Sequence, residues 1–244
     1  SHVDRSISDA SAFLDTNIQG TYNLLQNARE EKVSLFLQVS TDEVYGSLGK
    51  TGYFTEKSLI QPNSPYAASK ASADLICRSF FETFSFPVII TRCCNNYGPY
   101  QFPEKLIPLF ITNLIENRSV PIYGDGMNVR DWIYVEDHCR AIDAILRKGL
   151  PGEVYNIGSR QEMTNLDITN IIMTRLDKPQ SCKAFVKDRL GHDRRYAIDP
   201  YKLESDIKWS PSYSFDKAID LTISWYQDNE NWWKPLKEKS FKSS

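Results

Sequence analysis

Two short segments of the 244-residue chain combine residue types that could carry out acid–base chemistry. In the first, Tyr66 and Lys70 are four residues apart, which places them one above the other on a helix. A free tyrosine has a pKa of about 10, and a nearby ammonium lowers that pKa by stabilising the phenolate. Such a tyrosine can take the proton of an alcohol while hydride leaves the same carbon. The same spacing also occurs on exposed helix faces without chemistry, so this pair alone leaves both interpretations open.

The second segment is Thr41-Asp42-Glu43, which directly follows an apolar run of strand length. Ligands of open parallel sheets bind at the carboxyl ends of the strands. Two adjacent carboxyl groups there can acquire different pKa values, so that one serves as an acid and the other as a base. A turn with solvated acidic residues is the alternative interpretation of these three residues.

The elements that must position these residues alternate along the chain. Apolar periodicity predicts strands at residues 34–40, 87–92, 130–134, 153–157 and 183–186, and helices at 9–31, 64–84, 102–117, 135–148, 166–176 and 214–229. This alternation indicates an α/β fold, with a mostly parallel sheet and crossover helices. The tail that carries Lys234, Lys237, Lys239 and Lys242 is expected to be a frayed, solvated end.

Composition excludes several classes of protein. Apolar residues make up 41% of the chain and charged residues 25%, as in ordinary globular proteins, and the net charge of −2 argues against a nucleic-acid partner. No apolar run approaches the roughly 18 residues that a membrane span needs, and we expect no secretory leader. The five cysteines lack CxxC spacing and are expected to be reduced thiols of a cytoplasmic protein. His2 and His138 have no metal-like companions, so no metal site is predicted.

One glycine pattern resembles a phosphate-binding loop. Residues 46–52 fit G-x-x-G-x-x-G, but they do not follow a strand directly and no amphipathic helix comes after them. We therefore expect a mobile surface loop here.

Seven segments, in order and covering nearly the whole chain, resemble the extended short-chain dehydrogenase/reductase superfamily and, within it, the dTDP-glucose 4,6-dehydratases. They are residues 1–6 (SHVDRS), 40–46 (STDEVYG), 66–70 (YAASK), 95–108 (NNYGPYQFPEKLIP), 128–132 (NVRDW), 153–158 (EVYNIG) and 191–196 (GHDRRY). The triplet Thr41-Asp42-Glu43 is the discriminating part, because related sugar-nucleotide epimerases lack the Asp–Glu pair.

The resemblance implies a doubly wound, Rossmann-like parallel sheet with a smaller α/β substrate-binding domain. Residues 1–100 would form the later portion of the NAD-binding domain, with the strand and helix around 150–176 returning to it, and residues 101–244 would mainly bind the sugar nucleotide. Family members begin with a strand, a glycine-rich turn and a helix that hold the NAD pyrophosphate. Because this chain starts at Ser1 and has only 11 glycines, we expect those units not to be among its residues, and expect it to bind NAD poorly alone.

The resemblance also implies the chemistry, that of an NAD-dependent hydro-lyase in deoxysugar (rhamnose-type) biosynthesis. Tyr66 would take the proton of the sugar 4-hydroxyl, helped by Lys70 and hydrogen-bonded Thr41, while hydride leaves C4. Glu43 would then remove the C5 proton and Asp42 would protonate the departing 6-hydroxyl. Return of the hydride to C6 gives the 4-keto-6-deoxy sugar.

Further positions match binding residues of the family. The resemblance places Ser1, Thr16, Tyr66, Lys70 and Asn96 near NAD. It places Ser1, Thr41, Asn95, Lys105, Leu106, Pro121, Ile122, Tyr123, Arg130, Asn165, Arg189 and His192 near the dTDP-sugar substrate. The helices that begin near Asp9 and Tyr66 are where this superfamily usually forms homodimers.

Two alternatives remain. One is a neighbouring sugar-nucleotide epimerase or decarboxylase, against which the Asp42–Glu43 pair argues. The other is a truncated, non-catalytic form.

Overall fold

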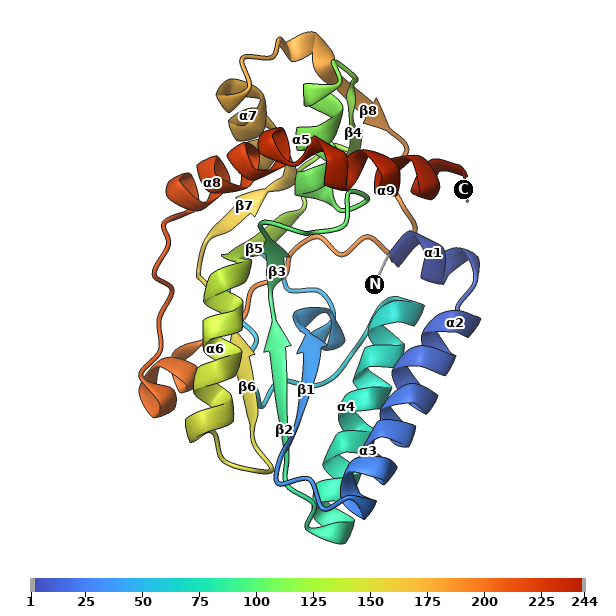
Figure 1. Cartoon of the computed structure of the whole chain (residues 1–244), viewed down its shortest axis with the longest axis vertical. Helices are drawn as coiled ribbons and strands as arrows, with labels where there is room; N and C mark the ends of the chain where they lie inside the picture. The colour runs from blue at the N-terminus through green and yellow to red at the C-terminus, as the bar shows by residue number, and fades with distance from the viewer. Residues whose placement is uncertain (1–2, 243–244) are drawn as a thin grey trace.

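The structure, a computed structural model, describes residues 3–242, with side chains through residue 239. Its helices are α1 (Val3–Ser8), α2 (Ser11–Leu14), α3 (Gly20–Glu30), α4 (Pro65–Phe84), α5 (Leu106–Ile115), α6 (Val135–Lys148), α7 (Asn165–Arg175), α8 (Phe215–Asp228) and α9 (Glu230–Lys242). Its strands are β1 (Phe36–Thr41), β2 (Val88–Cys93), β3 (Asn95–Tyr97), β4 (Val120–Tyr123), β5 (Val129–Tyr134), β6 (Val154–Ile157), β7 (Glu162–Thr164) and β8 (Lys183–Val186). Figure 1 shows two stacked parts, with β1, β2 and β6 in the lower part and α5, α7, α8 and α9 in the upper.

The lower part is built on a parallel sheet with the strand order β1-β2-β6. Alternate residues of the central strand β2 face opposite sides: Ile89 packs in the cluster with Ile145 of α6, whereas Val88 and Ile90 pack with Leu25 of α3. Helices thus cover both faces of the sheet, which explains why β2 is apolar throughout. The register pairs Thr41 with Cys93 and Cys93 with Ile157, so the carboxyl ends of all three strands meet at one edge.

Local sequence signals set the ends of α4. The Ser64 side chain accepts a hydrogen bond from the Ala67 amide at 3.1 Å, and Pro65 occupies the first helical position, where its missing N–H costs nothing. The last helical residue is Phe84. The next residue, Ser85, has a φ of 52°, which is left-handed and ends the helix. The predicted helix over 9–31 is instead divided into α2, a wider π turn (Asp15–Gln19) and α3.

The upper part has its own apolar core, formed mainly by α5, α7 and α8 around β5. Its strands form two small sheets, with the order β3-β5-β7 in one and β4-β8 in the other. Of the segment 150–176, β6 joins the lower sheet, whereas α7 packs in the upper core. Within residues 3–242 the strands form three short sheets, and the parallel α/β arrangement is clear.

The expectation of a frayed C-terminal end is wrong for the described part of the tail. Residues 230–242 form α9, in which Trp233 is fully buried and its indole N–H donates to the Tyr226 carbonyl at 2.7 Å. Lys237 is only 3% exposed, because its ammonium pairs with Glu116 at 2.8 Å. Packing against α5 and α8 thus orders a segment whose charge suggested solvation.

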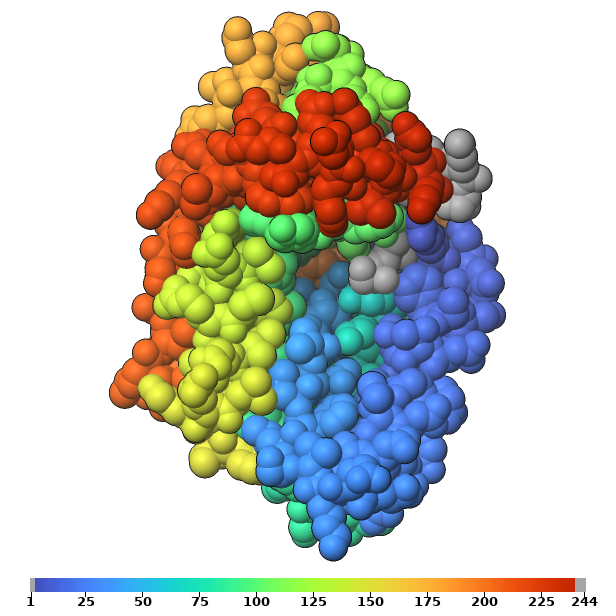
Figure 2. Space-filling view, in the orientation of Figure 1, coloured from blue at the N-terminus to red at the C-terminus, as the bar shows by residue number. Residues whose placement is uncertain are grey.

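The helices show no membrane-spanning character within the described residues, and one face of the molecule is hollowed (Figure 2). Over residues 3–242, none of the helices is both long and apolar enough to cross a membrane. Figure 2 shows a hollow on one face, between the red helices α8 and α9 above and the blue N-terminal helices below.

Candidate functional site

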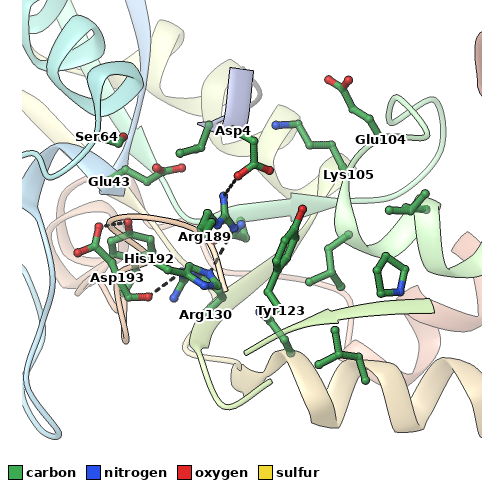
Figure 3. A pocket seen from close by; sticks show the side chains of 18 of the residues that line it. Asp4, Glu43, Ser64, Glu104, Lys105, Tyr123, Arg130, Arg189, His192 and Asp193 are labelled. Atoms are coloured by element: carbon green, nitrogen blue, oxygen red, sulfur yellow. Dashed lines mark hydrogen bonds and ion pairs between the residues drawn. The ribbon is translucent and has the colours of Figure 1, made fainter. Parts of the chain in front are cut away.

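A cavity of about 210 Å³ lies where the two parts of the molecule meet. The lower part contributes Glu43 and Ser64 to its wall, and the upper part contributes Lys105, Arg130 and Arg189. In Figure 3 the Glu43 carboxylate points toward the region where Arg189 and Lys105 lie. A pocket with several fixed cations suits an anionic ligand.

The Thr41-Asp42-Glu43 triplet lies at the carboxyl end of β1, where the chain enters a single 3₁₀ turn (Asp42–Tyr45). The Thr41 hydroxyl accepts a hydrogen bond from the Glu43 amide at 3.3 Å and donates one to Asp42 Oδ1 at 3.3 Å. The turn ends at Gly46, where φ is 84° and a Cβ atom would lie 2.3 Å from the Gln61 carbonyl oxygen. Only glycine satisfies both conditions, and it fixes the turn that holds both carboxyl groups.

The two carboxyl groups meet different surroundings. Asp42 is 2% exposed, and its Oδ2 has no hydrogen-bond partner among the described residues. Burial raises the pKa of Asp42 well above its ordinary value, and the charge of Glu43 adds to this, while Arg130 opposes it. Glu43 lines the cavity, and burial also raises its pKa, against the opposing charges of Arg130 and Lys105. The geometry therefore favours a protonated Asp42 beneath a Glu43 that faces cations.

Tyr66 and Lys70 lie one turn apart near the start of α4. The Tyr66 ring packs edge-on against Phe13, with centroids 6.1 Å apart. Burial raises the pKa of Tyr66, and the charge of Glu43 raises it further, so the expected lowering by Lys70 is not seen in this structure. The Lys70 ammonium instead donates a hydrogen bond to the Val39 carbonyl at 2.7 Å.

Arg130 is held rigidly at the back of the cavity. Its guanidinium lies over the Tyr196 ring at 4.2 Å and donates to the Asp193 carbonyl at 2.9 Å. The Asp193 carboxylate in turn accepts hydrogen bonds from Asn63 at 2.6 Å and from the Tyr196 hydroxyl. This network joins β5 to the loop before α4, and so ties the cationic wall to the part that carries Tyr66.

Arg189 and His192 form a second basic group in the loop after β8. Arg189 Nη2 lies 3.3 Å from His192 Nε2, and His192 Nδ1 lies 2.6 Å from Asp188 Oδ1. Arg189 also reaches Asp4 of α1 at 3.8 Å, as Figure 3 shows. Burial and the Arg189 charge lower the pKa of His192. The imidazole is thus suited to a neutral hydrogen-bonding role.

The structure brings together most of the residues that the sequence assigned to the substrate. Those that line the cavity are Asn95, Lys105, Leu106, Pro121, Ile122, Tyr123, Arg130, Asn165, Arg189 and His192. Of the expected catalytic residues, Glu43 lines it as well. Thr41, Asp42, Tyr66, Lys70 and Asn96 are not part of this wall, and Thr16 is exposed on the π turn after α2. Ser1, assigned to both cofactor and substrate, lies outside the described residues, as does His2.

Sequence reasoning missed several residues of the wall, among them Asp4, Glu104, Asp193 and Tyr196. Asp193 and Tyr196 stand in the GHDRRY segment beside His192, so their position in that motif was the available signal. Asp4 and Glu104 also stand in motif segments, SHVDRS and NNYGPYQFPEKLIP, but acidic residues are not expected in an anion-binding wall.

The sheet edge next to Tyr66 fits part of a nicotinamide cofactor. Asn96 donates to the Cys94 carbonyl at 3.1 Å, but its buried Oδ1 has no hydrogen-bond partner in the described part of the chain. Cys93, at the same strand end, lies 3.5 Å from the Asn96 amide and interacts electrostatically with Lys70. A buried unpaired acceptor at this edge suits the carboxamide N–H₂ of a nicotinamide.

The glycine-rich segment 46–52 is a surface loop, and no helix follows it. It is anchored and not free: the Leu48 amide donates to the Arg195 carbonyl at 3.0 Å, and Arg195 Nη1 donates to the Gly52 carbonyl at 3.0 Å. Over residues 3–242, no group of three or more His, Cys, Asp and Glu side chains is arranged to hold a metal ion.

Comparisons with known proteins agree with this architecture. The family model of GDP-mannose 4,6 dehydratase matches residues 1–222. A probable dTDP-glucose 4,6-dehydratase of Sinorhizobium fredii is 48% identical over 99% of this chain and 73% of its own length.

Solved structures of such enzymes superpose closely. DesIV, the dTDP-glucose 4,6-dehydratase of Streptomyces venezuelae with NAD and TYD bound, has 51% identity and a TM-score of 0.95, covering 97% of this chain and 73% of that one. The Bacillus anthracis enzyme in complex with NAD has 53% identity and a TM-score of 0.88, covering 91% and 71%. Fold and site together define an NAD-dependent nucleotide-sugar 4,6-dehydratase, a hydro-lyase. The chain belongs to the dTDP-glucose 4,6-dehydratase family, which confirms the resemblance.

Proposed function

We propose that this chain supplies the catalytic and substrate-binding residues for dehydration of dTDP-glucose to dTDP-4-keto-6-deoxyglucose. The observation that carries the proposal is the pair Asp42–Glu43, whose carboxyl groups meet different surroundings within one turn. Elimination of water needs one group that accepts a proton and one that donates it, and the pair offers both.

In this proposal Tyr66 takes the proton of the sugar 4-hydroxyl, and Thr41 hydrogen-bonds to the same hydroxyl. Tyr66 lies one helical turn from Lys70. In this proposal the Lys70 ammonium stabilises the phenolate as it develops and offsets the burial that raises the Tyr66 pKa. Bound NAD, held by Lys70, Tyr66 and Asn96, would supply the hydride acceptor for C4 and the hydride donor for C6.

Glu43 removes the proton from C5, which is acidified by the neighbouring ketone at C4. Glu43 suits this role because it lines the cavity and cations favour its carboxylate form. Asp42 donates its proton to the departing 6-hydroxyl, since burial raises the pKa of Asp42 and favours its protonated form. The atoms balance when Glu43 gives a proton back to C5 as hydride reaches C6. The 6-hydroxyl and the Asp42 proton leave as water, and the proton that Tyr66 takes from the 4-hydroxyl makes up for the one that Asp42 gives.

The remaining wall binds the rest of the substrate. Lys105, Arg130 and Arg189 suit the diphosphate, because guanidinium and ammonium groups pair strongly with phosphate oxygens. The segment Pro121-Ile122-Tyr123 and Asn165 line the same cavity and suit the nucleoside.

Incubation of the protein with dTDP-glucose and NAD tests the proposal. A 4-keto product, detected by its absorbance in alkali, supports it. An epimer or a pentose would instead support the neighbouring epimerase or decarboxylase activity. Absence of turnover in a protein whose fold is intact by circular dichroism would support a non-catalytic form.

We also propose that the chain forms a homodimer through α2, α3 and α4, and that its two stacked parts act as cofactor-binding and substrate-binding domains. Leu14 and Leu24 are 44% and 63% exposed, and Leu75 and Phe84 of α4 are 54% and 47% exposed. Such apolar exposure on neighbouring helices favours association. The Leu24→Glu substitution should lower the molar mass measured by light scattering toward that of a monomer.

A further inference from the structure

Asp74 is a buried carboxylate that the proposed mechanism does not use. It follows Tyr66 and Lys70 on α4 at successive intervals of four residues, so the three side chains share one helix face. Asp74 is only 1% exposed and does not line the substrate cavity. A carboxylate is rarely buried this far without a partner or a role.

Arg92 of β2 holds this carboxylate in place. Arg92 Nε lies 2.9 Å from Asp74 Oδ2, and the side chains of this ion pair are 5% and 1% exposed. Arg92 Nη1 also donates to the Tyr45 hydroxyl at 3.0 Å, and that hydroxyl donates to Asn156 Oδ1 at 2.8 Å. The pair is therefore fixed by β6 and by the same turn that carries Asp42 and Glu43.

The Lys70 ammonium lies in the field of this carboxylate. Burial lowers the pKa of Lys70, and the charge of Asp74 is the main opposing influence. The other groups that act on Lys70 are the thiols of Cys77 on α4 and Cys93 on β2. Burial raises the pKa of each thiol to about 12, so both are neutral at pH 7 and Asp74 supplies the negative charge.

We propose that Asp74 is a positioning residue for Lys70: its buried carboxylate, fixed by Arg92, keeps the Lys70 side chain charged and directed toward the end of β1. The hydrogen bond of 2.7 Å from Lys70 to the Val39 carbonyl holds the ammonium at β1. Burial raises the pKa of Asp74, and the Arg92 charge is the main opposing influence that favours the carboxylate form. Because Arg92 is the direct ion-pair partner of Asp74, Lys70 stays bonded to the Val39 carbonyl at the sheet edge. The inference rests on the proposed function only where it concerns turnover.

Competitive labelling measures the protonation of Lys70 without any need for turnover. The full chain is treated with trace acetic anhydride over a range of pH, and acetylation of Lys70 is followed by mass spectrometry of its peptide. In Asp74→Asn, Lys70 should deprotonate about one pH unit lower than in the parent, which is about a tenfold change in its reactive fraction at a given pH.

Asp137→Asn is the matched control. Asp137 is also a buried carboxylate, 1% exposed and paired with Arg140 at 2.6 Å, but it lies on α6 and not beside Lys70. It should leave the Lys70 labelling profile unchanged. An unchanged profile in folded Asp74→Asn, or an equal shift in Asp137→Asn, overturns the proposal.

The single variant leaves the Arg92 charge buried without its partner, which can prevent folding. Asp74→Asn combined with Arg92→Gln removes both charges and should shift Lys70 in the same direction by a smaller amount, because the Arg92 cation is also gone, while Asp74→Glu should restore the parent profile. In a preparation that turns over, Asp74→Asn should also move the alkaline limb of kcat to lower pH. Absence of turnover in the folded parent, with the labelling shift still present in Asp74→Asn, would contradict the proposed function and leave the positioning role standing.

Discussion

Asp42 and Glu43 are neighbours in the chain, yet one is enclosed by protein and the other faces a cavity lined with cations. Asp42 is 2% exposed and bonded by the Thr41 hydroxyl at 3.3 Å, whereas Glu43 lines the space that Lys105 and Arg130 share. Burial raises the pKa of both, but cations oppose this more fully at Glu43. This asymmetry within one turn makes the two roles experimentally separable.

Replacing Glu43 by Gln should abolish proton removal from C5. The amide keeps the size of the side chain but cannot accept the proton, and general-base catalysis contributes about 100-fold or more. We expect turnover to fall by at least that factor, and expect that deuterium from heavy water no longer enters C5 of the sugar. Exchange at the parent rate would show that another group is the base.

Replacing Asp42 by Asn should stabilise the fold near neutral pH. The pKa of Asp42 is raised in the folded state, so the folded chain holds this proton more tightly than the unfolded chain. The associated stability is present below the unfolded pKa and is lost as pH rises through the folded pKa. Asn stays neutral, so the variant should be more stable than the parent at pH 8 by about 1 kcal/mol, which is about 2–4 °C in Tm for a chain of this size.

The stability comparison has an internal control. At pH 4 the parent Asp42 is protonated, and the two Tm values should agree. Turnover should nevertheless fall about 100-fold in Asp42→Asn, because the acid for the departing hydroxyl is gone. Equal Tm values at both pH values would contradict a raised pKa at Asp42.

Replacing Tyr66 by Phe removes only the phenolic hydroxyl. If Tyr66 is the group that accepts the 4-hydroxyl proton, hydride transfer should slow by about 100-fold or more, and the absorbance of reduced nicotinamide should no longer develop on mixing with substrate and NAD. Tyr22, 42% exposed on α3, gives a control variant, Tyr22→Phe, that should react like the parent. Undiminished hydride transfer in Tyr66→Phe would remove this residue from the mechanism.

The sequence predicted the parts of the fold that local signals determine. The bounds of α4 and α6 follow from caps and periodicity, and the structure places them within a residue of the expectation. The strands β3, β4 and β7 have only three or four residues, too few to show a period, and their pairing partners are distant in sequence. The tail was mispredicted because burial of Lys237 depends on Glu116, 121 residues away.

The candidate site, like the fold, could be predicted from the sequence only in part. Residue types and motif order were enough to select Glu43, Arg130 and Arg189, which the structure brings to one cavity. The sequence could not show which residues hold these side chains in place. Asp193 is an example, because it accepts hydrogen bonds from both Asn63 and Arg130. The direction of the Tyr66 pKa was also beyond it, since that depends on burial and on carboxylates from another strand.

Arg189 should contribute to substrate binding through charge, and Arg194 offers a matched control five residues away. Arg189 lines the cavity with its side chain 25% exposed, whereas Arg194 is 56% exposed and pairs with Asp125 at 2.8 Å outside it. A charge-assisted contact to a diphosphate contributes about 1.5–3 kcal/mol, so Arg189→Ala should raise KM about 10–100-fold. Arg194→Ala should leave KM within about twofold, since exposed ion pairs contribute little.

Added salt should raise the parent KM more than that of Arg189→Ala, because the variant has one fewer charge to screen. Equal KM values for both variants would place the diphosphate elsewhere in the cavity.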